Sequence, residues 1–139
     1  MTTPLDPAPS PGVHYFTMDR VMRYTPFCAD FGPFNLGMMH HLGQGVPLDY
    51  KTAVKWYTLS AEQGFVEAQA NLGVMYALGQ GVIEDKVYAH MWGNILNSNG
   101  HEDGKKIMDY LLKQGMTPSQ VEKAQDLARE CIKKNYKGC

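Results

Sequence analysis

The sequence contains no long hydrophobic run and no excess of charge of one sign. No stretch of about 18 consecutive apolar residues occurs among its 139 residues, so it predicts no membrane-spanning helix. Thirteen Lys and Arg side chains are balanced by fourteen Asp and Glu side chains, and the formal net charge is −1. This balance excludes a generally basic nucleic-acid binder and an acidic disordered tail. We therefore expect a soluble globular chain about one domain long, with no nucleic acid as a partner.

Motifs of catalysis and metal binding are also absent. The sequence has no Gly-x-Ser-x-Gly segment, no zinc-ligand spacing and no paired carboxylates. His40 and His41 are adjacent, so on a helix their side chains diverge by about 100° and cannot easily hold one ion. Gly43-Gln44-Gly45 is similar to a fragment of a phosphate loop, but no Gly-Lys-Ser/Thr follows it. We expect no enzymatic activity, no cofactor and no metal.

The sequence instead repeats itself with a period of 36 residues. Residues 29–64 and 65–100 share 13 identical positions out of 36. The longest shared stretch is Leu-Gly-Gln-Gly-Val, found at 42–46 and again at 78–82. A fixed period of this length is typical of solenoids, in which each unit packs against its neighbours. Much of the glycine content therefore belongs to the repeat and does not indicate general flexibility.

Each repeat predicts two helices joined by a glycine-containing loop. The four predicted helices cover residues 31–42, 50–63, 66–78 and 86–99. Gly43 and Gly79 end the first helix of each unit, because glycine is unfavourable in a helix interior. Asp49 and Asp85 stand where an N-cap is needed, since their carboxylates can accept hydrogen bonds from free backbone amides. A glycine then ends each second helix.

Two glycines, Gly37 and Gly73, fall inside predicted helices. Because they carry no side chain, we expect a partner helix to approach the bare backbone at these points. Ala53 and Ala89 are the expected opposing residues, since they are also small. Two repeated tryptophans are expected to occupy structural positions on the second helices: Trp56 and Trp92.

Residues 101–139 are interpreted as a degraded third repeat followed by a capping helix. In the 36-residue frame, Met108 takes the place of Leu72, and Asp109 replaces the packing glycine. Thr117 begins a capping box before a helix predicted at about 118–135. One side of that helix is predicted to be apolar and consists of Val121, Ala124, Leu127, Ala128, Cys131 and Ile132. The predicted fold class is all-α, an α-solenoid of helix-turn-helix repeats closed by a polar-faced helix.

Residues 33–139 resemble the Sel-one-like repeat (SLR) family, a relative of the tetratricopeptide repeat. The motif that carries the resemblance runs through the second unit as Asn71-Leu72-Gly73-x-x-Tyr76-x-x-Gly79-x-Gly81-Val82-x-x-Asp85, followed by Ala89-x-x-Trp92. The closing helix is similar to that of many bacterial members. Because members mostly act as scaffolds, the resemblance implies a non-catalytic module that binds a protein or peptide. We expect it to be a monomer or a weak dimer.

The resemblance also implies a binding face. In tetratricopeptide-like stacks the first helix of each unit lines the concave side, and an asparagine there can clamp a peptide backbone through its donor and acceptor atoms. Asn35 and Asn71 would be these asparagines. The remaining candidate residues on this face are Phe34, Met38, His41, Val74, Leu78 and, for positive charge, Lys105 or Lys106. The alternative role for the two asparagines is to bond the backbone of a neighbouring repeat.

Three cysteines are too few for a disulfide framework. Cysteine-rich exported SLR proteins carry pairs with a similar spacing, so the resemblance implies a bridge between Cys131 and Cys139; the alternative is two free thiols. A bridge requires an oxidising compartment, whereas residues 1–28 lack the apolar core of a signal peptide. The expected location is cytoplasmic if Met1 is the natural start, and periplasmic or exported if the pair is bridged.

The N-terminal part differs from the repeats. Residues 1–12 are proline-rich and are interpreted as a flexible segment, and residues 13–28 as an extension of uncertain origin. The stretch 13–36 is similar to the start of the N-terminal domain of the mitotic-exit dual-specificity phosphatases. Their catalytic signature, His-Cys followed five residues later by Arg, is absent, so no phosphatase activity is implied. A coincidence, a fusion or a chimeric gene would each explain the similarity.

The alternative function is an enzymatic one. Some cysteine-rich SLR proteins are linked to β-lactamase-like or penicillin-binding activity, which would make this chain an exported envelope protein that acts on peptidoglycan-type ligands. Such an activity needs a nucleophile with a base beside it, and the sequence shows no such pair.

Overall fold

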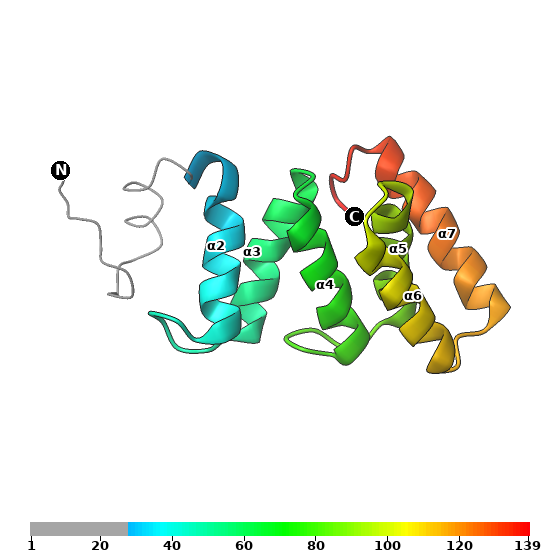
Figure 1. Cartoon of the computed structure of the whole chain (residues 1–139), viewed down its shortest axis with the longest axis horizontal. Helices are drawn as coiled ribbons and strands as arrows, with labels where there is room; N and C mark the ends of the chain where they lie inside the picture. The colour runs from blue at the N-terminus through cyan, green and yellow to red at the C-terminus, as the bar shows by residue number, and fades with distance from the viewer. Residues whose placement is uncertain (1–27) are drawn as a thin grey trace.

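The computed structural model describes residues 28–139. The interpretations given above for residues 1–12 and for the extension up to residue 27 lie outside these residues, as does most of the phosphatase-like stretch. The described chain is built of helices that stack side by side along its long axis (Figure 1). Their bounds are α2 Cys28–Leu42, α3 Tyr50–Glu62, α4 Val66–Leu78, α5 Lys86–Ser98, α6 Glu102–Lys113 and α7 Pro118–Lys133. The described residues contain no strand and no helix long and apolar enough to cross a bilayer.

Side-chain caps begin four of these helices, α3, α5, α6 and α7, and that of α6 is His101. The Asp49 carboxylate accepts hydrogen bonds from the backbone N–H groups of Lys51 and Thr52, at 3.1 and 3.3 Å. The Asp85 carboxylate accepts one from the backbone N–H of Tyr88 at 3.0 Å. Both caps have extended backbones. Thr117 and its capping box begin α7. Each cap satisfies amides that a helix start leaves without an internal partner.

The glycine loops join each pair of helices and also dock one repeat on the next. Gly43 and Gly79 have left-handed backbones, with φ of 68° and 70°. A Cβ atom at Gly81 would lie 2.5 Å from the carbonyl oxygen of Tyr50, so the second loop rests on the start of α3. Gly45, one period earlier, meets only the end of the Met39 side chain. The glycine at this point of the loop thus serves contact with the preceding repeat.

The two helix-interior glycines do lie at close helix crossings. A Cβ at Gly37 would lie 2.6 Å from the ring of Tyr57, and one at Gly73 would lie 3.3 Å from Cβ of Trp92. The opposing residues are therefore larger than expected: Tyr57 replaces Ala53 at the first crossing, and Ala89 contributes only its carbonyl oxygen, 3.8 Å away, at the second. Ala53 and Ala89 are themselves fully buried in the core.

The two tryptophans differ in burial. Trp92 is 1% exposed, while Trp56 is half-buried. The reason is that α7 packs against α5, which carries Trp92. The capping helix therefore covers the second repeat more fully than the first.

The third repeat does not bury the residues that the 36-residue period predicts. Ile107 and Leu111 are buried, whereas Met108, expected at the buried position, is only half-buried. Asp109 is exposed, so that position needs no glycine. The close crossing is made instead by Gly104, whose Cβ would lie 2.5 Å from the backbone nitrogen of Asn97 in α5. Helix α6 thus fits tightly against α5.

Helix α7 has a narrower apolar side than its sequence predicts. Ala124, Ala128 and Cys131 are buried, but Leu127 is 37% exposed and Ile132 is 45% exposed. One buried residue per turn is sufficient to pack α7 in place, because α7 contacts mainly a single helix, α5. It forms the end of the stack (Figure 1).

The chain after α7 turns back towards the first repeat. Cys131 and Cys139 are joined by a disulfide. Lys137 Nζ donates a hydrogen bond to the carbonyl oxygen of Glu62 at 2.9 Å, and the Gly138 backbone N–H donates one to Glu62 Oε2 at 3.0 Å. The Tyr88 hydroxyl donates to the Cys139 carbonyl. This tail therefore connects α7 to the end of α3.

Candidate functional site

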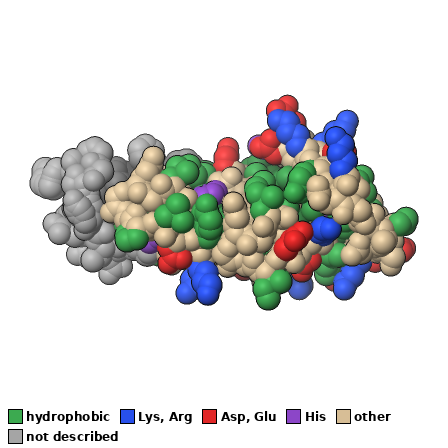
Figure 2. All heavy atoms as spheres, turned by 90° about the horizontal axis from the view of Figure 1, so that it is seen from below, with side chains coloured by type: hydrophobic (Ala, Val, Ile, Leu, Met, Phe, Trp, Pro, Cys, Tyr) green, Lys and Arg blue, Asp and Glu red, His purple; other side chains and the backbone are tan. Residues whose placement is uncertain are grey.

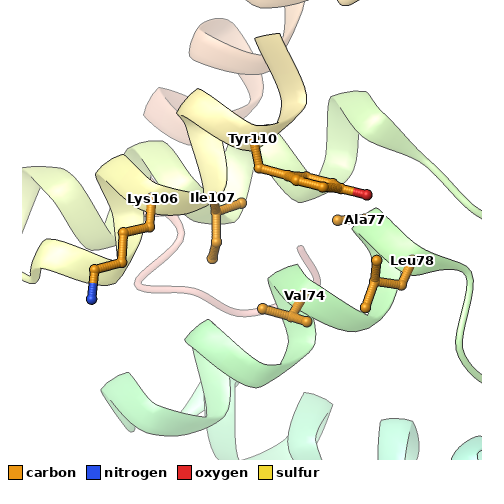
Figure 3. Close-up of a pocket in the computed structure, with 6 residues that line it drawn as sticks. All are labelled: Val74, Ala77, Leu78, Lys106, Ile107 and Tyr110. Carbon is orange, nitrogen blue, oxygen red and sulfur yellow. The ribbon is translucent and has the colours of Figure 1, made fainter. Parts of the chain in front are cut away.

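An open apolar groove lies between α4 and α6. Its volume is about 290 Å³. Side chains from the two helices approach it from opposite sides (Figure 3). The lining residues are Val74, Ala77, Leu78, Lys106, Ile107 and Tyr110. We call this site the α4–α6 groove.

The groove has a buried floor and exposed walls. Ala77 and Ile107 are each 6% exposed and form part of the core between α4, α5 and α6. Val74, Leu78 and Tyr110 are 39%, 50% and 41% exposed. Val74 and Leu78 are one helical turn apart on α4, so their exposed side chains lie on the same face of that helix.

Among the residues that the structure describes, one cation lines the groove, and it is already paired. Lys106 Nζ lies 3.3 Å from Glu102 Oε1 and 3.5 Å from Asp103 Oδ1. The hydrogen bond to Glu102 and the attraction of both carboxylates raise the pKa of Lys106. Lys106 therefore lies beside two carboxylates, and its role in supplying positive charge to a partner stays a prediction.

Asn35 and Asn71 occupy different environments despite their equivalent places in the repeat. Asn35 is exposed, whereas Asn71 is half-buried, with its Nδ2 atom 3.9 Å from the sulfur of Met38. Burial raises the pKa of Tyr57 to about 12, and the nearby Asn71 side chain opposes part of this rise. Both contacts lead from the second repeat to the first. They agree with the inter-repeat role for Asn71.

The candidates on α2 pack mostly against α3 and α4. The ring of Phe34 contacts those of Tyr57 and Phe65, with centroids 5.8 and 4.8 Å apart. His41 Nδ1 lies 3.0 Å from the Tyr57 hydroxyl, and partial burial lowers the pKa of His41. Met38 packs against the core. The structure therefore brings together Val74, Leu78 and Lys106 but leaves the α2 candidates outside the groove.

Three lining residues were missed by reasoning from the sequence: Ala77, Ile107 and Tyr110. The repeat itself held the signal for two of them. Tyr110 stands one period after Val74, and Ile107 one period after Asn71. Extending the binding-face positions into the third repeat would have found both.

The described residues contain no group of three or more His, Cys, Asp and Glu side chains that could hold a metal ion. Seen from below, the described surface carries groups of hydrophobic side chains together with both acidic and basic ones (Figure 2). The groove, in contrast, is lined by apolar residues apart from Lys106.

Residues 34–65 and 66–101 each match the Sel1 repeat family. The chain carries two Sel1 repeats. No curated protein matches the sequence.

This Sel1-repeat chain is similar to a protective antigen with an SLR fold from uropathogenic Escherichia coli, with a TM-score of 0.73 and 28% identity over 84% of this chain and 27% of that one. A Sel1 repeat protein from Oxalobacter formigenes has a TM-score of 0.60 and 26% identity over 81% of this chain and 52% of that one. The Sel1-repeat chain thus spans about a quarter and about half the length of these two proteins.

Proposed function

We propose that this Sel1-repeat protein is a binding module whose α4–α6 groove holds an apolar segment of a protein partner. The fold is a helical repeat scaffold of the kind that typically supports protein–protein interaction. The observation that supports this particular site is the exposure of Val74, Leu78 and Tyr110 around one hollow. Covering such side chains removes apolar surface from water, which favours association.

The size of the groove suits a few side chains. A volume of about 290 Å³ is at the small end of ligand pockets, and the site is open to solvent. A short segment of a folded or folding partner can place its apolar side chains there while its backbone stays outside. The groove therefore supplies an anchor, and neighbouring helices supply further contact area.

The test compares two leucines of matched exposure. Leu78 is 50% exposed in the groove, and Leu112 is 49% exposed on α6 outside it. Leu78→Ser should abolish retention of partner proteins from the native host, because it removes an apolar wall. Leu112→Ser should retain the same partners as the wild type. Equal retention by the wild type and Leu78→Ser would contradict the proposed site.

We also propose that the module has no catalytic role. Within residues 28–139, the groove lining offers Tyr110 and a paired Lys106, and no serine, cysteine or histidine. The purified protein should therefore not hydrolyse nitrocefin. Hydrolysis that follows the protein through successive purification steps would contradict this part of the proposal and favour the envelope-enzyme alternative.

The location that we propose is an oxidising compartment, such as the periplasm or the cell exterior. The support for it is the disulfide between Cys131 and Cys139, since such bonds persist mainly outside the cytosol. Thiol labelling of the protein in intact native cells, followed by mass spectrometry, tests this. Full labelling of both cysteines before reduction would indicate a cytoplasmic protein.

A further inference from the structure

The α4–α6 groove has an acidic end. Glu67 lies in the first turn of α4, and Glu102 and Asp103 lie in the first turn of α6. Glu67 and Asp103 stand one repeat period apart, so they occupy the same place on neighbouring helices. All three carboxylates belong to residues with substantial exposure: Glu67 is exposed, and the side chains of Glu102 and Asp103 are 83% and 45% exposed.

The acidic and apolar ends lie on the same side of each helix. Glu67 precedes Val74 by seven residues, and Asp103 precedes Tyr110 by seven. Seven residues make nearly two turns, which places each pair on one face about 10 Å apart. A partner that covers the apolar walls therefore also passes close to the carboxylates.

The acidic end keeps a net negative charge. Among the described residues, the one ammonium group that pairs with its three carboxylates is that of Lys106, which contacts two of them; the neighbouring Lys105 is exposed and forms no ion pair, and His101 Nδ1 lies 3.8 Å from Asp103 Oδ2. The two helix N-termini add partial positive charges of about half a unit each, which offset only part of the excess. Lys113 lies seven residues beyond Lys106, at the opposite end of α6.

We propose that the groove binds an amphipathic segment of a protein partner that carries Lys or Arg at one end of its apolar side. This rests on the proposed function above and adds the chemistry of the partner. The apolar side chains lie between Val74, Leu78 and Tyr110, and the basic side chain lies between Glu67 and Asp103. An acidic segment is disfavoured because Lys106, the one lining cation among the described residues, already lies beside Glu102 and Asp103.

The test uses three designed amphipathic helical peptides of about four turns that share one leucine face. They differ only at the end of that face, which carries two Lys, two Gln or two Glu residues. Binding is measured by fluorescence anisotropy at low and high salt. We expect the Lys peptide to bind about five-fold tighter than the Gln peptide, the Glu peptide to bind most weakly, and the differences to shrink as salt screens the charges.

Two double variants assign the effect to the groove. Glu67→Gln with Asp103→Asn should remove the preference for the Lys peptide and leave binding of the Gln peptide unchanged. Glu122→Gln with Asp126→Asn makes the same change of charge on α7 and should keep the preference. Circular dichroism verifies that both variants remain folded.

The outcomes separate this inference from the proposed function. If the three peptides bind equally, or the Lys preference survives in the Glu67/Asp103 variant, the basic partner is excluded while the groove stands. If Leu78→Ser leaves binding of every peptide unchanged, or if no peptide binds, both the groove and the partner chemistry are overturned.

Discussion

The Cβ position of Gly104 lies 2.5 Å from the carbonyl oxygen of Gly93, a separation that only a hydrogen substituent allows. The two glycines face each other across α5 and α6. Tyr57 stands one period before Gly93 and fills the equivalent space with its ring against Gly37. Removal of that ring in the second repeat lets α6 approach the backbone of α5. The groove depends on this approach, because it places Ile107 and Tyr110 beside α4.

Gly104→Ala should therefore destabilise the protein by about 3 kcal/mol, since the added methyl group would overlap the backbone of α5. Gly73→Ala is the matched control, because its new methyl group would meet only side-chain atoms near 3.3 Å, one of them the flexible end of Ile107. Alanine is more favourable than glycine in a helix by about 1 kcal/mol, and this gain offsets much of the destabilisation that the close contact causes. Urea unfolding of both variants checks this prediction. Equal losses of stability would show that the backbone contact at Gly104 is not special.

Loss of the Cys131–Cys139 disulfide should lower the free energy of unfolding by about 2–3 kcal/mol, as expected when a short loop is no longer closed in the unfolded chain. A variant with Ser at both positions should match the reduced wild type in urea unfolding. Added reductant should not change the stability of this variant, which retains Cys28. If the urea midpoint of the wild type is the same with and without reductant, the prediction is contradicted.

Asn71→Ala should cost about 1 kcal/mol of stability because it removes the contacts to Met38 and Tyr57. Asn35→Ala should change stability by less than about 0.5 kcal/mol, because Asn35 is exposed. Thermal unfolding of the two variants distinguishes the inter-repeat role of Asn71 from a peptide clamp. If neither variant loses stability and both lose partner binding, the clamp is the correct role.

Stability should fall as the pH drops below about 6.5. Burial lowers the pKa of His90 and of His41 from the ordinary value of 6.5, so the unfolded chain binds protons first. The contribution of the neutral histidines is complete above that value and is lost as the pH falls towards their lower folded-state pKa values. His90, which is 3% exposed, can contribute a slope of up to about 1.4 kcal/mol per pH unit.

The control for this pH dependence is His90→Gln, whose side-chain oxygen can still accept a hydrogen bond from Asn94. Urea unfolding between pH 7.5 and pH 5 should give a shallower dependence for this variant than for the wild type. Parallel curves for the two proteins would show that His90 is not responsible.

The repeat period made most of the fold predictable. Asp49, Asp85 and the glycines after each helix mark boundaries through local chemistry, so the predicted helix ends agree with the structure within a few residues. Local signals of this kind act within one turn and need no knowledge of the neighbours.

The packing of the third repeat could not be predicted in the same way. Whether Met108 is buried depends on which helix lies beside it. In the first two repeats the second helix packs against the first helix of its own unit, whereas α7 packs mainly against α5 rather than α6. The ion pairs of Lys106 are different, because Glu102 and Asp103 are four and three residues away on one helix and the repeat period already places its start near residue 102. The groove could likewise be predicted only after the third repeat had been placed against the second, because its lining residues come from both.

The tail after α7 changes how the stack is expected to unfold. Most contacts in repeat proteins join near neighbours, so their ends can unravel independently. Lys137 bonds to Glu62 across 75 positions of sequence, and Gly138 across 76. Fraying of the last helix therefore also removes contacts from the first repeat. This long-range closure raises the contact order above that of a simple helical array, and it favours slower folding and a single cooperative transition.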